Sequence, residues 1–179
     1  MGLGGAWLSL HWPAILAAHD HARAAVNSSP APAFQFFSPE QAAEVEAAAA
    51  QIIPADDTPG AREARVIYFI DRALVTFDKD KQPAYVQGIR ELQAKTRELV
   101  SQAKSFAELS SSQQIQVLHA LEKTDFFELL RLHTIMGFLA PPEYGGNHNQ
   151  VGWKLIGLED EMTYEPPFGY YDAEYDKRQ

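Results

Sequence analysis

The stretch FFSPEQAAEVEAAAAQII, residues 36–53, decides the predicted fold of this chain. Ser38 is a suitable N-cap, Pro39 fits the first helical position, and Gln41 completes a capping box with the serine. These signals predict a helix that begins at Ser38 and continues to about Ile53, where the proline that follows stops it. One face of this helix carries Ala43, Ala47, Ala50 and Ile53, and its small alanines let a neighbouring helix approach closely.

Apolar residues recur at helical spacing in four further segments. We predict helices from about Ala61 to Phe77, from Pro83 through Leu99, from Ser110 or Ser111 through Leu121, and from Thr124 or Asp125 through Phe138. In the first two of these helices the apolar stripes are Val66, Ile67, Ile70 and Leu74, and then Tyr85, Ile89, Leu92, Thr96 and Leu99. In the last two helices they are Ile115, Leu118 and Leu121, and then Phe127, Leu130, Ile135 and Phe138. No segment alternates strictly enough to predict a strand. The predicted fold class is therefore all-α, a small bundle of about five helices over residues 36–140.

The composition changes after Ala140, where glycine and proline alternate with aromatic residues. Such a segment disfavours a continuous helix, and disordered segments are usually poor in aromatic rings. The rings of residues 141–179 must therefore pack against the helical core or against another chain. We predict an extended arm that binds a partner chain, with an intramolecular lid as the alternative.

The predicted partner contacts in this arm are aromatic side chains and one glycine-rich turn: Tyr144, Gly145, Gly146, Asn147, Trp153, Tyr164, Phe168, Tyr170 and Tyr171. Trp153 is the predicted anchor, because large aromatic side chains dominate interface energies. The turn formed by Gly145, Gly146 and Asn147 is also predicted to supply backbone geometry with positive φ.

The N-terminal region is interpreted as a secretory leader, residues 1–24, followed by a linker, residues 25–35. Its apolar run LGGAWLSLHWPAILAA is shorter than the ~20 residues of a spanning helix, and Ala22-Arg23-Ala24 fits a small-x-small cleavage signal. The charged start of such a leader is missing, so we expect the native gene to begin upstream and to encode an arginine pair there. The alternative is an N-terminal helix that belongs to the mature protein.

The overall composition limits both the partners and the chemistry of the chain. Its 179 residues are enough for one domain, and a formal net charge of −9 argues against DNA or RNA as a partner. The absence of cysteine excludes a disulfide, a thiolate-bound iron–sulfur cluster and a c-type haem attachment. If the chain takes part in electron transfer, the redox centres must therefore belong to other chains.

The adjacent acids Asp56 and Asp57 could shift each other's pKa as a catalytic pair. The favoured interpretation is that Asp56, Asp57 or Thr58 caps the helix that follows with a side-chain oxygen, because negative charge is stabilising at a helix N-terminus. Arg62 and Arg65 are then the expected ion-pair partners of the two acids across the turn.

Three histidines, His119, His133 and His148, lie beyond the N-terminal region. A metal site would need two or three of them to converge with carboxylates, and the sequence holds no HExxH motif. His133 is predicted to be a hydrogen-bonded histidine inside the bundle, and His148 to lie where it could contact a partner. The alternative is a stand-alone helical enzyme with a metal or carboxylate site around Glu143, His133 and His148.

Two segments of the chain resemble the gluconate 2-dehydrogenase subunit 3 family. The first is IPADDTPGA, residues 53–61, continuing through Glu63-Ala64 to Phe69-Ile70-Asp71; the second is Gly137-Phe138, then PEYGGN, residues 142–147, and GWKLIG, residues 152–157. Their order and spacing also fit, and Phe36-Phe37-Ser38 resembles the start of the family domain. The resemblance therefore covers most of the chain, from about Phe36 to Gly157.

The resemblance implies a helical, periplasmic small subunit with no catalytic, cofactor-binding or metal-binding residues of its own. Its partners would be a large flavoprotein that holds FAD, alone or with an iron–sulfur cluster, and often a multihaem cytochrome c that holds haem c. The flavoprotein would oxidise a sugar, sugar acid or polyol, and the cytochrome would pass electrons toward the respiratory chain at the inner membrane. The small subunit would support the folding, stability and twin-arginine export of the flavoprotein. A small module that binds a ligand through its aromatic arm is the second alternative.

Overall fold

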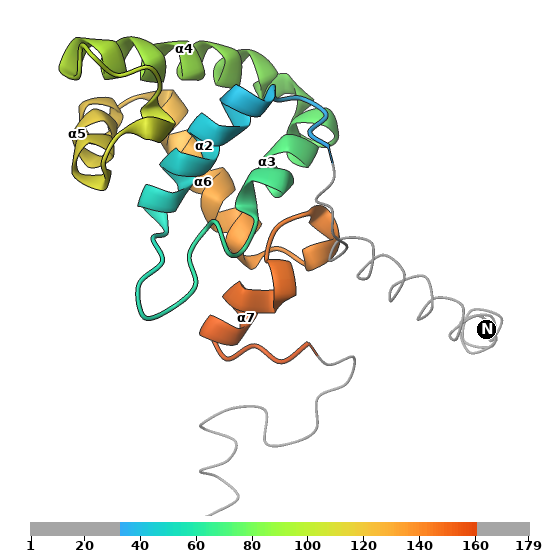
Figure 1. The fold of residues 1–179 in the computed structure, drawn as a ribbon. Coiled ribbons are helices and arrows are strands. Elements are labelled where there is room, and N and C mark those ends of the chain that lie inside the picture. The colour runs from blue at the N-terminus through green and yellow to red at the C-terminus, as the bar shows by residue number, and fades with distance from the viewer. Residues whose placement is uncertain (1–32, 161–179) are drawn as a thin grey trace, which may run out of the picture.

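The computed structural model describes residues 33–160 of the chain, drawn in colour in Figure 1. The predicted leader, residues 1–24, and the predicted contact residues Tyr164, Phe168, Tyr170 and Tyr171 lie outside the described residues. Among the helices of this described part, none is long and apolar enough to cross a membrane.

Over the described residues the chain forms six α-helices and four short 3-10 turns, without a strand. The α-helices are α2 (Pro39–Ile52), α3 (Val66–Val75), α4 (Gln82–Leu99), α5 (Ser111–Leu121), α6 (Asp125–Leu139) and α7 (Val151–Leu155). The 3-10 turns are η1 (Lys79–Lys81), η2 (Phe106–Glu108), η3 (Pro142–Tyr144) and η4 (His148–Gln150). The prediction of an all-α bundle is therefore confirmed.

Three helix starts follow the capping signals in the sequence. The Ser38 side chain accepts from the Gln41 N–H, and the Gln41 side chain accepts from the Ser38 N–H at 3.0 Å, so the predicted capping box of α2 is present. Ser110, rather than Ser111, caps α5 in the same way. The Thr124 hydroxyl caps α6 by accepting from the Phe127 N–H at 3.2 Å. Local hydrogen bonding was thus sufficient to place these three starts.

The central position of α2 explains why its predicted packing face was only partly right. The helix contacts α3, α4, α5 and α6, and Figure 1 shows it in the middle of the described part, with α4 across one end and α7 at the other. Ala47 is buried as predicted, but Ala43 is exposed and Ala50 is half-buried. The buried set is broader: Ala42, Glu44, Val45, Ala47, Ala48 and Ala49. Neighbours on several sides bury more of the helix than a single stripe would.

The predicted start of α3 at Ala61 is wrong, because residues 61–65 form a turn and the helix begins at Val66. Arg65 lies in the left-handed region with φ 53°, a conformation that no local signal in the sequence indicated.

The predicted capping role of the acids is wrong for Asp56, whose carboxylate accepts from the N–H and the hydroxyl of Thr58, both at 2.9 Å. This aspartate therefore closes a turn within the loop before α3.

The predicted apolar stripe of α3 is confirmed, and it forms part of a continuous core. Val66, Ile67, Ile70 and Leu74 are all buried. Large side chains from the other elements are fully buried with them, namely Tyr85, Leu92, Phe106 and Leu130. Three predicted stripe residues, Leu99, Ile115 and Ile135, are instead exposed, and Ile135 belongs to an apolar surface described below.

Asp71 anchors the entering chain to α3. Its buried carboxylate accepts the backbone N–H groups of Gln35 at 2.7 Å, Phe36 at 2.9 Å and Phe37 at 3.0 Å. The Phe34 ring also stacks on Tyr68 with a centroid separation of 4.9 Å. One side chain of α3 thereby fixes the direction in which the chain enters α2.

We expect Asp71→Ala to destabilise the fold by about 2–3 kcal/mol, because a buried carboxylate that accepts several N–H groups would be lost and those donors left unpaired. Urea denaturation followed by circular dichroism would measure the change. The exposed Asp57→Ala is the matched control and should stay within about 0.5 kcal/mol of wild type. Equal stability of the two variants would show that Asp71 does not anchor the entering chain.

Candidate functional site

Residues 141–158 fold back onto the helical core, and we call this segment the clasp. It contains η3, η4 and α7; η3 packs against α3, and α7 packs against α6. The prediction of an extended, non-helical arm is therefore wrong for its described part. Pro141, Pro142, Gly145, Gly146 and Gly157 lie outside α7, and only Gly152 is part of this five-residue helix.

Asn147 holds the clasp closed. Its side chain is fully buried, its Nδ2 donates to the Ala140 carbonyl at 3.0 Å, and its Oδ1 accepts from the Gly152 N–H at 2.8 Å. One amide thus joins the end of α6 to the start of α7. Asn147 has φ 46° and Gly145 has φ 104°, which confirms the predicted positive-φ turn at these two positions.

Gly146 is required because the clasp approaches α6 so closely. A Cβ atom at Gly146 would lie 2.1 Å from the carbonyl oxygen of Gly137 in α6. Because that neighbour is backbone, it cannot move aside, and no side chain fits at this position. The GGN sequence therefore encodes the contact between the clasp and the core.

The structure divides the predicted partner-contact residues of the clasp into two groups. Gly145, Gly146 and Asn147 are buried within the chain, so in this conformation they serve its own packing. Tyr144 is 47% exposed. Trp153 is half-buried, and its indole N–H donates to the Leu139 carbonyl at 2.7 Å. Partner contact therefore stays a prediction for Tyr144 and Trp153, whose rings are at least partly accessible.

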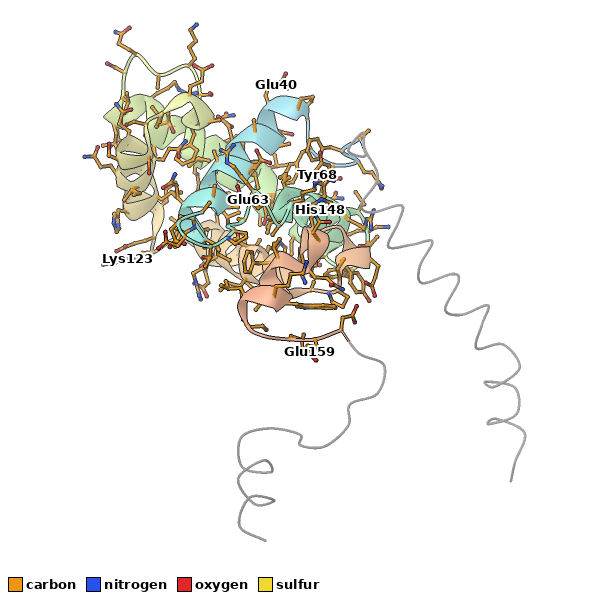
Figure 2. All side chains as sticks on the ribbon, turned by 60° about the horizontal axis from the view of Figure 1, so that its bottom comes forward. Glu40, Glu63, Tyr68, Lys123, His148 and Glu159 are labelled. Carbon is orange, nitrogen blue, oxygen red and sulfur yellow. The ribbon has the colours of Figure 1, made fainter. Side chains whose placement is uncertain are left out.

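His148 lies where the clasp meets the start of α3, as Figure 2 shows. Its backbone N–H donates to the Ala64 carbonyl at 3.0 Å. Burial lowers the pKa of this histidine, and the nearby Arg65 guanidinium lowers it further. His148 is therefore favoured in its neutral form, and contact between its side chain and a partner stays a prediction.

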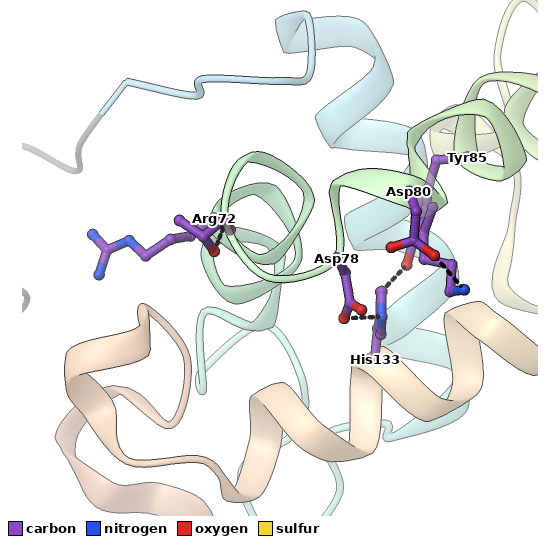
Figure 3. A network of polar contacts seen from close by, with 7 residues as sticks. Arg72, Asp78, Asp80, Tyr85 and His133 are labelled. Carbon is purple, nitrogen blue, oxygen red and sulfur yellow. Dashed lines mark hydrogen bonds and ion pairs between the residues drawn. The ribbon is translucent and has the colours of Figure 1, made fainter.

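A buried polar network links α4, α6 and the turn after α3 (Figure 3). His133 of α6 lies between Tyr85, whose hydroxyl is 3.0 Å from Nδ1, and Asp78, whose Oδ2 is 3.2 Å from Nε2. The Tyr85 and His133 rings also stack, with a centroid separation of 5.6 Å. The prediction that His133 is hydrogen-bonded inside the bundle is confirmed.

One neutral tautomer of His133 satisfies both neighbours. With its proton on Nε2, the imidazole donates to Asp78 and accepts from the Tyr85 hydroxyl through Nδ1. A second proton, on Nδ1, would point at the Tyr85 hydroxyl, and the hydroxyl could then no longer donate its own hydrogen to Nδ1. Burial lowers the pKa of His133, although the Asp78 carboxylate partly opposes this shift. Burial also raises the pKa of Tyr85 well above its usual value.

The structure does not assemble the metal form of the alternative site predicted around Glu143, His133 and His148. His133 is engaged by Tyr85 and Asp78 in the core, and the Glu143 carbonyl accepts from Arg72 Nη1 at 2.6 Å. Within residues 33–160, no group of three His, Asp or Glu side chains is placed to hold a metal ion.

An apolar groove of about 570 Å³ lies beside the polar network. It is lined by Phe69, Phe77, Ile135, Met136, Leu139, Ala140, Pro141 and Tyr144, which come from α3, the turn after it, α6 and the clasp. This groove was not predicted from the sequence. The available signal was the composition of α6, which is apolar around most of its circumference although only one side can face the bundle.

The family described as gluconate 2-dehydrogenase subunit 3 matches residues 39–159, from the start of α2 to just beyond the clasp. This range is more than half of the 179-residue chain. Searches of curated proteins and of solved structures gave no match.

The fold and its surface define a small all-α domain that is closed by a C-terminal clasp and carries an open apolar groove. This chain belongs to the gluconate 2-dehydrogenase subunit 3 family, as the resemblance of its two segments predicted. The family name implies a subunit of a multi-subunit gluconate dehydrogenase complex.

We expect Asn147→Ala to destabilise the chain by about 2–4 kcal/mol, since it leaves a buried carbonyl and a buried N–H unpaired and places alanine at positive φ. Asn149→Ala is the matched control: Asn149 has φ 56° but is exposed. The control should therefore lose only the free energy that it costs alanine to adopt a positive φ, about 1–2 kcal/mol. Thermal and urea unfolding would measure both, and equal losses would contradict the role of the buried amide.

The free energy of unfolding should fall as the pH drops below about 6.5, the ordinary pKa of histidine. Because the pKa of His133 is lowered in the folded state, the unfolded chain binds this proton at a higher pH than the folded chain does. Stability therefore rises with pH in this range, and the full contribution is present above it. His148 adds an effect of the same sign.

Urea unfolding at pH 5 and pH 7 would test this assignment. The difference between the two pH values should shrink in His133→Gln and persist in His119→Gln, which changes an exposed histidine of α5. An unchanged difference in His133→Gln would show that another group carries the pH dependence.

Proposed function

We propose that this chain is the non-catalytic small subunit of a periplasmic, membrane-associated, flavin-dependent dehydrogenase complex. The substrate of the complex would be a sugar, a sugar acid or a polyol. The observation that carries this proposal is the family match over residues 39–159. The large flavoprotein subunit would hold FAD, alone or with an iron–sulfur cluster, and a multihaem cytochrome c subunit would hold haem c.

The residues of the chain support an accessory role in two ways. Without cysteine, the chain has no thiolate to bind an iron–sulfur cluster and cannot attach a c-type haem. Exposed apolar side chains also gather on the groove and the clasp, as expected for a surface that another chain covers. The accessible clasp residues Tyr144 and Trp153, together with Tyr164, Phe168, Tyr170 and Tyr171 beyond the described residues, are the proposed contacts.

Export provides the physical reason for such a subunit. A flavoprotein binds its cofactor in the cytoplasm, so it must cross the inner membrane in a folded state, which the twin-arginine route permits. We propose that this chain carries the leader and takes the flavoprotein across as a bound passenger. The complex must then form before export and survive it, which favours a large interface.

The first experiment is purification of the tagged chain from its native host. We expect a flavoprotein dehydrogenase to co-purify in a fixed ratio, identified by mass spectrometry and by its flavin absorbance.

The second experiment is deletion of the gene for this chain. Deletion should deplete dehydrogenase activity from the periplasmic fraction, and the gene on a plasmid should restore that activity.

The two outcomes separate the parts of the proposal. If no flavoprotein accompanies the chain in a preparation that retains its native membranes, the accessory role is wrong. If the flavoprotein co-purifies but periplasmic activity is the same with and without the gene, the passenger role is wrong and the chain only stabilises the assembled complex.

A further inference from the structure

Helix α6 presents apolar side chains on two opposite sides. Toward the bundle it buries Phe126, Leu130, His133, Thr134, Gly137 and Phe138. On the outer side, Leu132, Ile135, Met136 and Leu139 keep between 37% and 49% of their surface exposed. Their spacing of three, one and three residues places all four on one stripe. Described residues therefore cover this stripe only in part, although helices that are apolar on all sides are normally buried.

Two aromatic side chains extend the stripe into a surface. Phe77 follows α3 and is 53% exposed, Tyr144 ends η3 and is 47% exposed, and both line the apolar groove with Ile135, Met136 and Leu139. Residues from three parts of the chain therefore form one continuous apolar surface. Scattered exposed apolar residues are ordinary, but a continuous surface of this kind marks an interaction site.

Both walls of the groove are held in place by buried or half-buried contacts. Phe77 directly precedes Asp78, which is bound to His133 in the core. Tyr144 directly follows Glu143, whose carbonyl accepts from Arg72 Nη1 at 2.6 Å. Because these contacts exist before anything binds, the groove is preorganised, and little conformational entropy is lost when a partner enters it.

We propose that the apolar groove and the adjoining Leu132 are the docking surface for an amphipathic helix of the catalytic flavoprotein subunit. This inference rests on the proposed function. The outer stripe of α6 is about 10 Å long, two helical turns, which matches a partner helix that anchors at positions i, i+3 or i+4, and i+7. Leucine-sized or aromatic anchors would complement the groove, since its lining is apolar.

Charge argues against a second copy of this chain as the occupant. The chain has a formal net charge of −9. Two copies that docked through the same surface would bring these charges together, and like net charge opposes self-association. A partner of different composition avoids this cost.

The family match argues against the chain's own terminal segments as the occupant. Every residue of the groove lies within residues 39–159, the range that the family description matches. Residues 1–32 and 161–179 lie outside that range. The groove therefore belongs to the matched domain and the terminal segments do not, which favours a partner chain as the proposed occupant.

The test measures the affinity between the purified chain and the flavoprotein identified by co-purification, using biolayer interferometry. Met136→Glu on α6 and Phe77→Ser on the turn after α3 should each weaken binding at least tenfold. Both residues are exposed, so the melting temperature of the isolated chain should change little. Leu99→Glu is the matched control, because Leu99 is 48% exposed at the end of α4 and does not line the groove; it should bind like wild type.

The remaining outcomes overturn the inference in distinguishable ways. If wild type and all three variants bind the flavoprotein equally, the docking surface is wrong while the proposed function stands. If wild type does not bind the flavoprotein, both fail. A dimer of the isolated chain that Met136→Glu dissociates would identify a second copy as the occupant.

A hydrophobic dye distinguishes the chain's own tail from a partner. Wild type should bind the dye, and Met136→Glu should bind much less of it. If wild type binds no dye until Phe168, Tyr170 and Tyr171 are changed to serine, the tail occupies the groove and the inference is overturned.

Discussion

The position of one neutral imidazole constrains much of this structure. His133 donates to Asp78 and accepts from Tyr85, and these contacts join the turn after α3, α4 and α6. The site is buried, so each group must find its partner within the protein, and a single tautomer meets the requirement. Because Phe77 is the residue before Asp78, the same contact that satisfies the core also sets one wall of the apolar groove.

The clasp sets the opposite wall by a different physical means. Gly146 allows the backbone to approach Gly137 of α6, and the Asn147 amide pairs groups that would otherwise be buried without partners. Neither interaction depends on an apolar side chain, although the result is that Tyr144 stands beside the outer stripe of α6. Polar contacts therefore shape a surface that is itself apolar, because hydrogen bonds fix direction while hydrophobic burial does not.

Features that depend on neighbours in sequence could be predicted, and features that depend on distant contacts could not. Ser38, Ser110 and Thr124 cap their helices through bonds that span three residues, and the α3 stripe follows from periodicity alone. The left-handed Arg65 that delays α3 has no such local signal. The clasp was predicted as an extended arm because its closure depends on the end of α6, which its own composition does not reveal. The groove was missed because three separate segments build it.

If the proposed docking on α6 is right, the two-sided character of this helix couples the stability of the chain to its partner. The inner side contributes to the core, whereas the side chains of the outer stripe keep 37% to 49% of their surface in water, and that exposed part adds nothing to the stability of the isolated chain. A partner that binds only the folded chain stabilises it by mass action, in proportion to the logarithm of its concentration relative to the dissociation constant. The net charge of −9 opposes association of the free chain with its own copies. Sequence features that look inconsistent within one chain, an acidic composition and a helix that is apolar on two sides, are therefore consistent in a subunit that is completed by another protein.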